Sequence, residues 1–539
     1  MKIYGNIFDV KEKKIVQGYV LTEGKRIKGI VEEKNLSGKY ILPGLIDAHI
    51  HIESSMLVPS RFAEEAVKHG TVTVVSDPHE IANVMGPEGV EFMIESGKTV
   101  PLKFYFGAPS CVPATAFENS GGEIGLEEIR KLLGREEIVY LSEMMNYPGV
   151  INGDSEVLEK ISLARKAGKP VDGHAPGLIG RELDAYIKAG ISTDHESISI
   201  EEAREKIRKG MKIQIREGSA ARALDRFHYL LSEDPGMLML CSDDLHPEML
   251  EQGHVNLLVK KLLLMGYDIF DIMQVALINP AEHYGIDAGM LRKGDSADFI
   301  VVDSPEAFNI LETWIDGEKV FDGKNINFKA DPSVAVNNFN CSRIREEDIK
   351  VENRKPAGRV IDAVDGDLVT GCYEWSHNQN GEYLESDTSE DVLKLIVKDR
   401  YKDAAPSVAF VRGFGLKQGA FASSVAHDSH NIIAVGAGDK EICRALNKVV
   451  EMKGGLVACS GDKCRSLQLE VAGLMSDVPC GTMASSYKQL SDMVGDMGSK
   501  LKSPFMTLSF MALLVIPELK LSDRGLFDGK KFQFTDLFI

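Results

Sequence analysis

Two histidines separated by one residue, His49 and His51, offer the clearest chemistry in this chain. They follow an apolar run, interrupted at Pro43-Gly44, that is typical of a β-strand. Because every second side chain of a strand lies on the same face, both imidazoles are expected to point into one space. Two imidazoles on one face can bind a divalent metal ion. A His-x-His pair also occurs on strands that bind no metal, so this interpretation needs support from the rest of the sequence.

That support comes from a repeated pattern of short apolar runs in the first half of the chain. Besides the strand that carries the two histidines, they are residues 71–76, 102–106, 138–141, 170–171, 190–193, 212–215 and 238–242. Segments between the runs, such as 59–69 and 155–167, have apolar residues at helical spacing. Eight strand–helix units in this order predict a (β/α)8 barrel of the TIM type.

Acidic and imidazole side chains recur where these predicted strands end. In chain order they are His49, His51, Asp77, His79, Glu80, Glu143, His174, His195, Asp243 and Asp244. The carboxyl ends of the strands of such a barrel meet at one mouth, which is where active sites lie. We therefore expect all of these side chains to face the same space.

The donor set at this mouth predicts two metal ions. Nitrogen and oxygen ligands are expected from His49, His51, His174, His195 and Asp243. Five ligands exceed the need of one tetrahedral ion, so Glu143 is expected to bridge to a second. Two ions that share a carboxylate suit hydrolytic attack, because they lower the pKa of bound water and polarise the bond under attack. The alternative for Glu143 is a solvated loop carboxylate.

The composition limits the classes of partner. The chain has 539 residues and a formal net charge of −19, which disfavours nucleic acid and anionic membranes as partners. The longest apolar stretch, 505–517, is shorter than the roughly 20 residues that cross a bilayer. The N-terminus lacks the apolar core of a signal peptide, so we expect a cytoplasmic protein. Cys459 and Cys464, two of eight cysteines, form only a weak metal-binding pattern.

The sequence also predicts further domains around the barrel. Residues 1–40 and 285–340 show short alternating strands and are expected to form one small β-sandwich. The barrel, residues 41–284, would then be an insertion into it. Residues 347–539, rich in glycine and alternating strands, are expected to form a separate α+β domain.

Several motifs together resemble one family. The order of His-x-His, a carboxylate on the fourth strand, two later histidines and an aspartate on the eighth resembles the amidohydrolase superfamily. Within it, the chain is similar to the adenine deaminases of bacteria and archaea over essentially its whole length. The motifs that carry this resemblance are HIESSM (51–56), VSDPHEIANV (75–84), DGHAPGL (172–178), CSDDLHPE (241–248), AHDSHNIIAVG (426–436) and PFMTLSFMALLVIPELKLSDRGLFD (504–528).

The resemblance implies hydrolysis of adenine to hypoxanthine and ammonia at two divalent ions, usually Mn²⁺ or Fe²⁺. Asp243 would take the proton from the attacking water, and a carboxylate, with Glu143 and Asp243 the nearest candidates, would return protons to the purine. The chain departs from relatives at two points. Residues 138–146 contain no lysine to be carbamylated, and His174 is not followed by a His-x-x-Glu glutamate.

Substrate contacts are expected from two segments near this centre. The residues are Asp77, His79 and Glu80 after the second strand, and His427, Asp428 and His430 in the HDSHN segment. The alternative for the HDSHN segment is a surface turn. We expect a homo-oligomer that binds only its small-molecule substrate.

Two other functions stay open at this point. One is another two-metal amidohydrolase that cleaves a cyclic amide or an N-acyl bond. The other is a catalytically inactive barrel that serves as an assembly scaffold.

Overall fold

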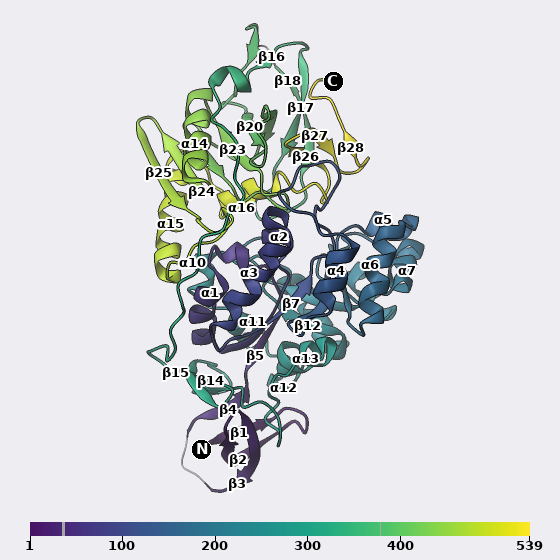
Figure 1. Ribbon diagram of the computed structural model, residues 1–539, viewed down its shortest axis with the longest axis vertical. Coiled ribbons are helices and arrows are strands. Elements are labelled where there is room, and N and C mark those ends of the chain that lie inside the picture. The colour runs from purple at the N-terminus through teal and green to yellow at the C-terminus, as the bar shows by residue number, and fades with distance from the viewer. Residues whose placement is uncertain (35–37, 378) are drawn as a thin grey trace.

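The computed structural model describes residues 1–34, 38–377 and 379–539. Three layers follow one another along the longest axis of the molecule (Figure 1). A small sheet that contains the N-terminus lies at one end, a β/α body lies in the middle, and the second half of the chain covers the other end. None of the helices within the described ranges has the length and apolar character needed to cross a membrane.

Eight parallel strands form the central barrel, as predicted. Their bounds are β5 Leu45–Ile50, β6 Thr71–Ser76, β7 Lys103–Ala108, β8 Ile138–Met144, β9 Val171–Gly173, β10 Thr193–Asp194, β11 Lys212–Arg216 and β12 Leu238–Cys241. Strands β5–β9 form one sheet and β10–β12 another. The Ser192 N–H donates to the Val171 carbonyl at 2.9 Å and joins the two sheets. The Asp243 N–H donates to the His49 carbonyl at 3.0 Å and closes the ring at the other seam.

The N-terminal segment and the segment after the barrel share one seven-stranded sheet. Its strand order is β15-β14-β13-β4-β1-β2-β3. The bounds are β1 Lys2–Asp9, β2 Lys14–Glu23, β3 Arg26–Glu32, β4 Tyr40–Pro43, β13 Phe299–Val302, β14 Ile310–Ile315 and β15 Glu318–Phe321. Strand β4 leads directly into the barrel and pairs antiparallel with β13, the first strand after it.

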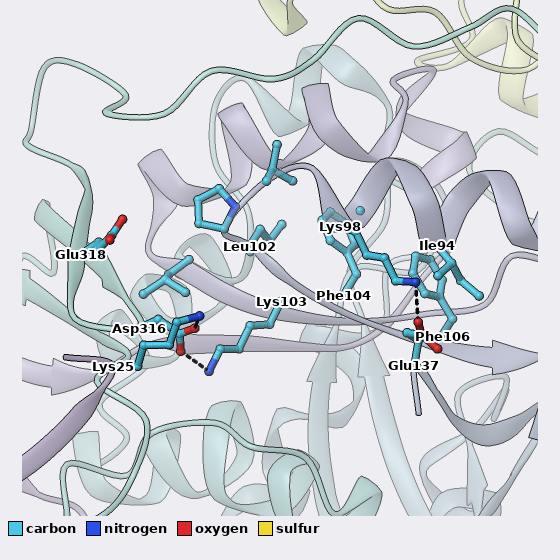
Figure 2. A pocket seen from close by; sticks show the side chains of 14 residues that line it. Lys25, Ile94, Lys98, Leu102, Lys103, Phe104, Phe106, Glu137, Asp316 and Glu318 are labelled. Carbon is cyan, nitrogen blue, oxygen red and sulfur yellow. Dashed lines mark hydrogen bonds and ion pairs between the residues drawn. The ribbon is translucent and has the colours of Figure 1, made fainter. Parts of the chain in front are cut away.

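A groove separates this sheet from the base of the barrel (Figure 2). Lys103, at the start of β7, crosses it and pairs with Asp298 at 2.6 Å and with Asp316 at 3.1 Å. Lys98 and Glu137 form a second ion pair at 2.6 Å along the same groove. Because Lys103 marks the amino end of its strand, the groove lies at the opposite end of the barrel from the strand ends that carry the predicted site.

The second half of the chain is built on an eight-stranded sheet with strand order β18-β17-β21-β20-β23-β22-β24-β25. The bounds are β17 Ala357–Asp362, β18 Gly371–Ser376, β20 Leu393–Lys398, β21 Ser407–Arg412, β22 Ala420–Ser423, β23 Ile432–Gly436, β24 Gly455–Ser460 and β25 Lys463–Gln468. Three helices accompany it, namely α14 Asp439–Met452, α15 Cys480–Asp496 and α16 Pro504–Phe510. Cys459 and Cys464 form a disulfide between the paired strands β24 and β25, so they are not metal ligands here.

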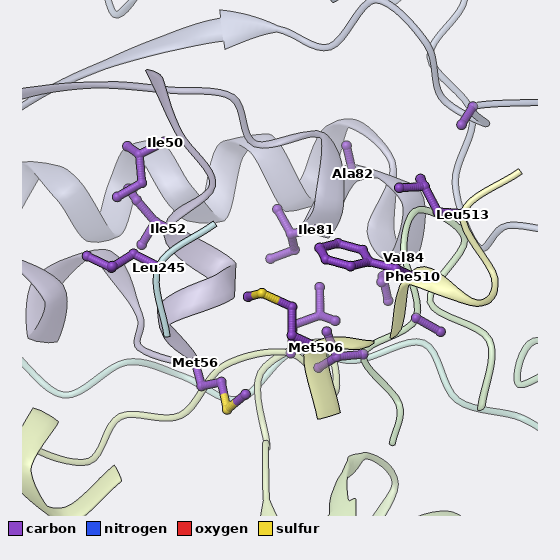
Figure 3. Close-up of a cluster of buried hydrophobic side chains, with 14 of the residues drawn as sticks. Ile50, Ile52, Met56, Ile81, Ala82, Val84, Leu245, Met506, Phe510 and Leu513 are labelled. Atoms are coloured by element: carbon purple, nitrogen blue, oxygen red, sulfur yellow. The ribbon is translucent and has the colours of Figure 1, made fainter. Parts of the chain in front are cut away.

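An apolar contact seals this domain onto the barrel mouth (Figure 3). Met506 and Phe510 of α16 lie against Ile81 of α2, the helix His79–Met85 that follows β6. Met56, from the loop after β5, belongs to the same buried cluster. Each of these side chains is at most 2 % exposed. Burial of one such side chain contributes about 1.5–3 kcal/mol, so the contact is a stable part of the fold.

A buried lysine supports the two barrel strands that carry His174 and His195. Lys206, on α8 (Ile200–Arg208), is fully buried and pairs with Asp194 at 2.9 Å and Glu202 at 2.6 Å. The other oxygen of Asp194 accepts the Ala175 N–H at 2.9 Å, next to His174. The lysine thus fixes the loops on which both histidines stand.

We expect Lys206→Met to destabilise the protein by about 3–5 kcal/mol, because it leaves two buried carboxylates without their cation. Lys209→Met, on the same helix but partly exposed, is the control and should cost less than about 1 kcal/mol. Denaturant unfolding of the two variants measures the difference. Equal stability of the two would show that Lys206 is not needed to compensate Asp194 and Glu202.

Candidate metal centre

The structure brings all six predicted metal ligands together at the barrel mouth. These residues are His49, His51, Glu143, His174, His195 and Asp243, and all are buried. Their side chains fall into overlapping groups whose donor atoms lie within 4.8 Å of one another. The prediction that the strand ends converge is therefore correct in its geometry.

Asp243 lies between the two histidines of the first strand. Its Oδ1 atom is 3.2 Å from Nε2 of His51 and 3.5 Å from Nε2 of His49. The two Nε2 atoms are themselves 3.2 Å apart. Three donor atoms at these separations can share one ion, because metal–nitrogen and metal–oxygen bonds are about 2.0–2.2 Å long.

Glu143, at the end of β8, presents one oxygen to each side of the site. Its Oε2 atom is 2.7 Å from Nδ1 of His174 and 3.1 Å from Nε2 of His195. Its Oε1 atom is 3.4 Å from Nε2 of His51 and 3.4 Å from Nδ1 of His79. A carboxylate between two sets of imidazoles has the geometry of a bridging ligand. The alternative of a solvated loop carboxylate is excluded, because Glu143 is 3 % exposed.

The pKa values of Glu143 and His195 are set by the contact between the carboxylate and the imidazoles. Burial would raise the pKa of Glu143, but the imidazoles of His174 and His195 outweigh it and hold that pKa well below its usual range. Burial would lower the pKa of His195, but the Glu143 carboxylate raises it to about 9. His195 therefore holds a proton at neutral pH when no other cation is present, and a metal ion would displace it.

The residues also satisfy a test of fit to metal ions. Asp77 Oδ2 and His79 Nδ1, which belong to one group of possible ligands with His51 and Glu143, are buried and have no hydrogen-bond partner among the described residues. Buried polar atoms are nearly always paired in folded proteins. Carboxylate and imidazole donors are also the set that divalent first-row metals bind. The residues of this mouth therefore fit divalent metal.

The six residues predicted to contact substrate divide into two groups. Asp77 and His79 join the metal-ligand side, since Asp77, His79, His51 and Glu143 form one group of possible ligands. Glu80 instead points to the C-terminal domain, where it contacts His427 and His430. Asp428 reaches back to His79, with 3.7 Å between its Oδ1 atom and Nε2. The HDSHN segment is thus a buried part of the site and not a surface turn.

Arg216 is a residue of the site that the sequence analysis missed. It ends β11, where its guanidinium pairs with both Asp243 and Glu196. Burial opposes the charge of the guanidinium, but Asp243 and Glu196 raise its pKa above the usual value. The predicted strand ended at residue 215, one residue too early, and a consistent search of strand ends would have found it.

A second group that sequence reasoning missed holds the first and last barrel strands together. Asp47 Oδ1 accepts the Ser242 N–H at 3.1 Å and the His49 N–H at 3.2 Å. Its Oδ2 atom lies 2.7 Å from Nε2 of His254, whose Nδ1 is 2.7 Å from the Thr71 hydroxyl. Residues that orient metal ligands in this way tune affinity from outside the coordination sphere.

A parallel barrel with histidines and carboxylates at its strand ends is the architecture of a metal-dependent hydrolase. Residues 40–320 match the model of the amidohydrolase family, and residues 367–533 match that of the adenine deaminase C-terminal domain.

Relatives along the whole chain narrow this class. Adenine deaminase of Salinibacter ruber is 51 % identical over 543 residues, covering 100 % of this chain and 99 % of that one. Adenine deaminase of Methanosarcina acetivorans is 50 % identical over 549 residues, with the same coverage. Among solved structures, β-aspartyl dipeptidase of Fervidobacterium islandicum aligns with a TM-score of 0.46 and 19 % identity over 60 % of this chain and 98 % of that one. The chain belongs to the adenine deaminase family of amidohydrolases.

We expect Glu143→Gln to lower the metal content of the purified protein by about one equivalent, because a neutral amide bridges two cations poorly. Glu137→Gln is the matched control, since Glu137 lies directly before the amino end of the same strand. Elemental analysis after gel filtration gives both numbers. Unchanged metal content in Glu143→Gln would show that Glu143 is not a bridging ligand.

Proposed function

We propose that this protein hydrolyses adenine to hypoxanthine and ammonia at a two-metal centre in the barrel mouth. The observation that carries the proposal is the position of Glu143, with one oxygen toward each set of imidazoles. Similarity to adenine deaminases over the full chain length supports the choice of reaction.

The proposed ligand sets follow from the distances. One ion would be held by His49, His51 and Asp243, and the second by His174 and His195, with Glu143 between them. The nitrogen and oxygen donors, with no cysteine among them, favour Mn²⁺ or Fe²⁺. When bound, the ions supply a lowered pKa for the attacking water and polarise the bond under attack.

The proposed general base is Asp243. It would accept the proton of the water that adds to C6 of the purine, while Arg216 holds its second oxygen in place. The structure supports Asp243 over its neighbour, because Asp244 turns away and accepts the Ser54 hydroxyl at 2.6 Å. Asp243 is also the proposed group that returns this proton to the purine, because both oxygens of Glu143 are assigned to the two ions.

The substrate space is enclosed by residues of both the barrel and the C-terminal domain in this proposal. We propose that Asp77, His79 and Glu80 form one wall and that His427, Asp428 and His430 close the other. The apolar seal of Figure 3 supports a closed space that admits the free base and excludes a ribose.

We also propose a composite domain of residues 1–40 and 285–340, a barrel of 41–284 and a C-terminal domain of 347–539. Homo-oligomeric assembly and cytoplasmic location stay predictions from the sequence.

We expect Asp243→Asn to lower kcat by roughly 10²–10⁴-fold, because an amide cannot accept the proton of the attacking water. Asp244→Asn should lose far less activity and keep both ions of the centre. Steady-state kinetics with adenine and elemental analysis of each variant test this. If Asp244→Asn is the inactive variant and Asp243→Asn is normal, Asp244 is the base.

We expect ammonia release from adenine and none from adenosine, because a closed space cannot admit the ribose at N9. A cyclic amide serves as the third substrate, since the two-metal centre alone does not select the electrophile. All three are assayed with the Mn²⁺-loaded enzyme. Activity only on the amide would replace adenine deamination by another amidohydrolase reaction, and equal rates with adenosine would contradict the closed space.

A further inference from the structure

A second group of metal-binding side chains lies between the barrel and the C-terminal domain. We call it the interdomain cluster and define it as Glu80, Asp244, His427, Asp428 and His430. The first two residues belong to the barrel, and the other three follow β22 of the C-terminal domain. None of the five is more than 6 % exposed.

The contacts within this cluster centre on the carboxylate of Glu80. One of its oxygens contacts Nδ1 of His427 and the other contacts Nε2 of His430. Donor atoms of Glu80, Asp244 and His427 all lie within 4.8 Å of one another. The donor atoms of His79, Glu80 and Asp428 satisfy the same condition. Two imidazoles and carboxylates at such separations are a donor set for divalent first-row metals.

The cluster concentrates buried negative charge. Glu80, Asp244 and Asp428 are three buried carboxylates. The guanidinium of Arg216 is 3.7 Å from Asp244 and already pairs with Asp243 and Glu196.

The Oδ2 atom of Asp428 is buried and has no hydrogen-bond partner among the described residues. An unpaired buried carboxylate oxygen is costly. A divalent cation where these oxygens converge would compensate two negative charges at once.

We propose that a third divalent cation binds among Glu80, Asp244 and His427 and fastens the C-terminal domain to the barrel mouth. Asp428 and His430 would complete or support its coordination. The proposal rests on the proposed function only for the two ions assigned to the centre around Glu143.

The position of this cation would couple it to the apolar seal. The His427 N–H donates to the hydroxyl of Ser509 at 3.1 Å, and Ser509 is on α16. The same helix carries Met506 and Phe510 of the seal (Figure 3). A ligand that binds only the assembled domains stabilises that assembly by mass action. The third cation would therefore act on closure of the mouth.

Metal counting tests the proposal. The double variant His427→Asn/His430→Asn should hold one equivalent of metal fewer than the wild type after gel filtration in Mn²⁺-free buffer. His377→Asn is the matched control, because His377 is another buried histidine of the C-terminal domain, whose Nε2 bonds to the Lys355 carbonyl and whose ring lies against Trp375, away from the cluster. It should hold the same number as the wild type. Equal metal content in all three proteins would overturn the proposal.

A measurement on the wild type covers the case in which the double variant does not fold. Metal-free full-length protein is titrated with Mn²⁺, and the free ion is followed by electron paramagnetic resonance. Three sites per chain are expected, and two sites would overturn the proposal. Adenine turnover is measured separately, so that three sites without deamination would contradict the proposed function alone. Deamination with only two sites would contradict the third cation alone.

Discussion

The structure depends on how buried negative charge at the barrel mouth is compensated. Glu143 and Asp243 are almost completely buried, and Arg216 is the guanidinium that pairs with Asp243. In a water-poor interior, one unpaired carboxylate is far more costly than at the surface. Imidazoles surround both groups and compensate them either as protonated rings or as ligands of bound metal. The mouth is therefore stable only with protons or metal ions in it, and metal ions allow it to do chemistry.

The C-terminal domain strengthens this constraint by excluding water. Phe510 and Met506 pack on Ile81 of helix α2, whose first two residues are His79 and Glu80. Attraction between an ion and a carboxylate grows as the effective dielectric constant falls, so a closed mouth binds cations more tightly than an open one. The domain that closes the mouth also places His427, Asp428 and His430 against His79 and Glu80. Apolar packing and ion binding thus favour the same closed arrangement.

Much of the site could be predicted, because in a barrel the place of a residue along its strand determines where its side chain lies in space. The alternation of a strand places His49 beside His51, and strand ends place His174, His195 and Glu143 at one mouth. Contacts between the domains could not be predicted in this way. Glu80 and His427 are 347 residues apart, and no periodicity relates them. The role of Lys206 could not be predicted either, because only the fold shows that this helical lysine lies under two strand ends.

The loop after His174 explains why the proposed reaction assigns the role of base to a carboxylate among the proposed ligands. At the position of the His-x-x-Glu glutamate the chain has Gly177, and in the same loop the Ala175 N–H donates to Asp194. Asp194 is in turn held by Lys206, so this loop is used to fix the two histidines. The loop therefore offers no acid or base to the substrate. In the proposed reaction, proton transfer is therefore assigned to a carboxylate of the proposed metal centre. Asp243 is the best placed carboxylate, because Arg216 orients one oxygen while the other faces His49 and His51.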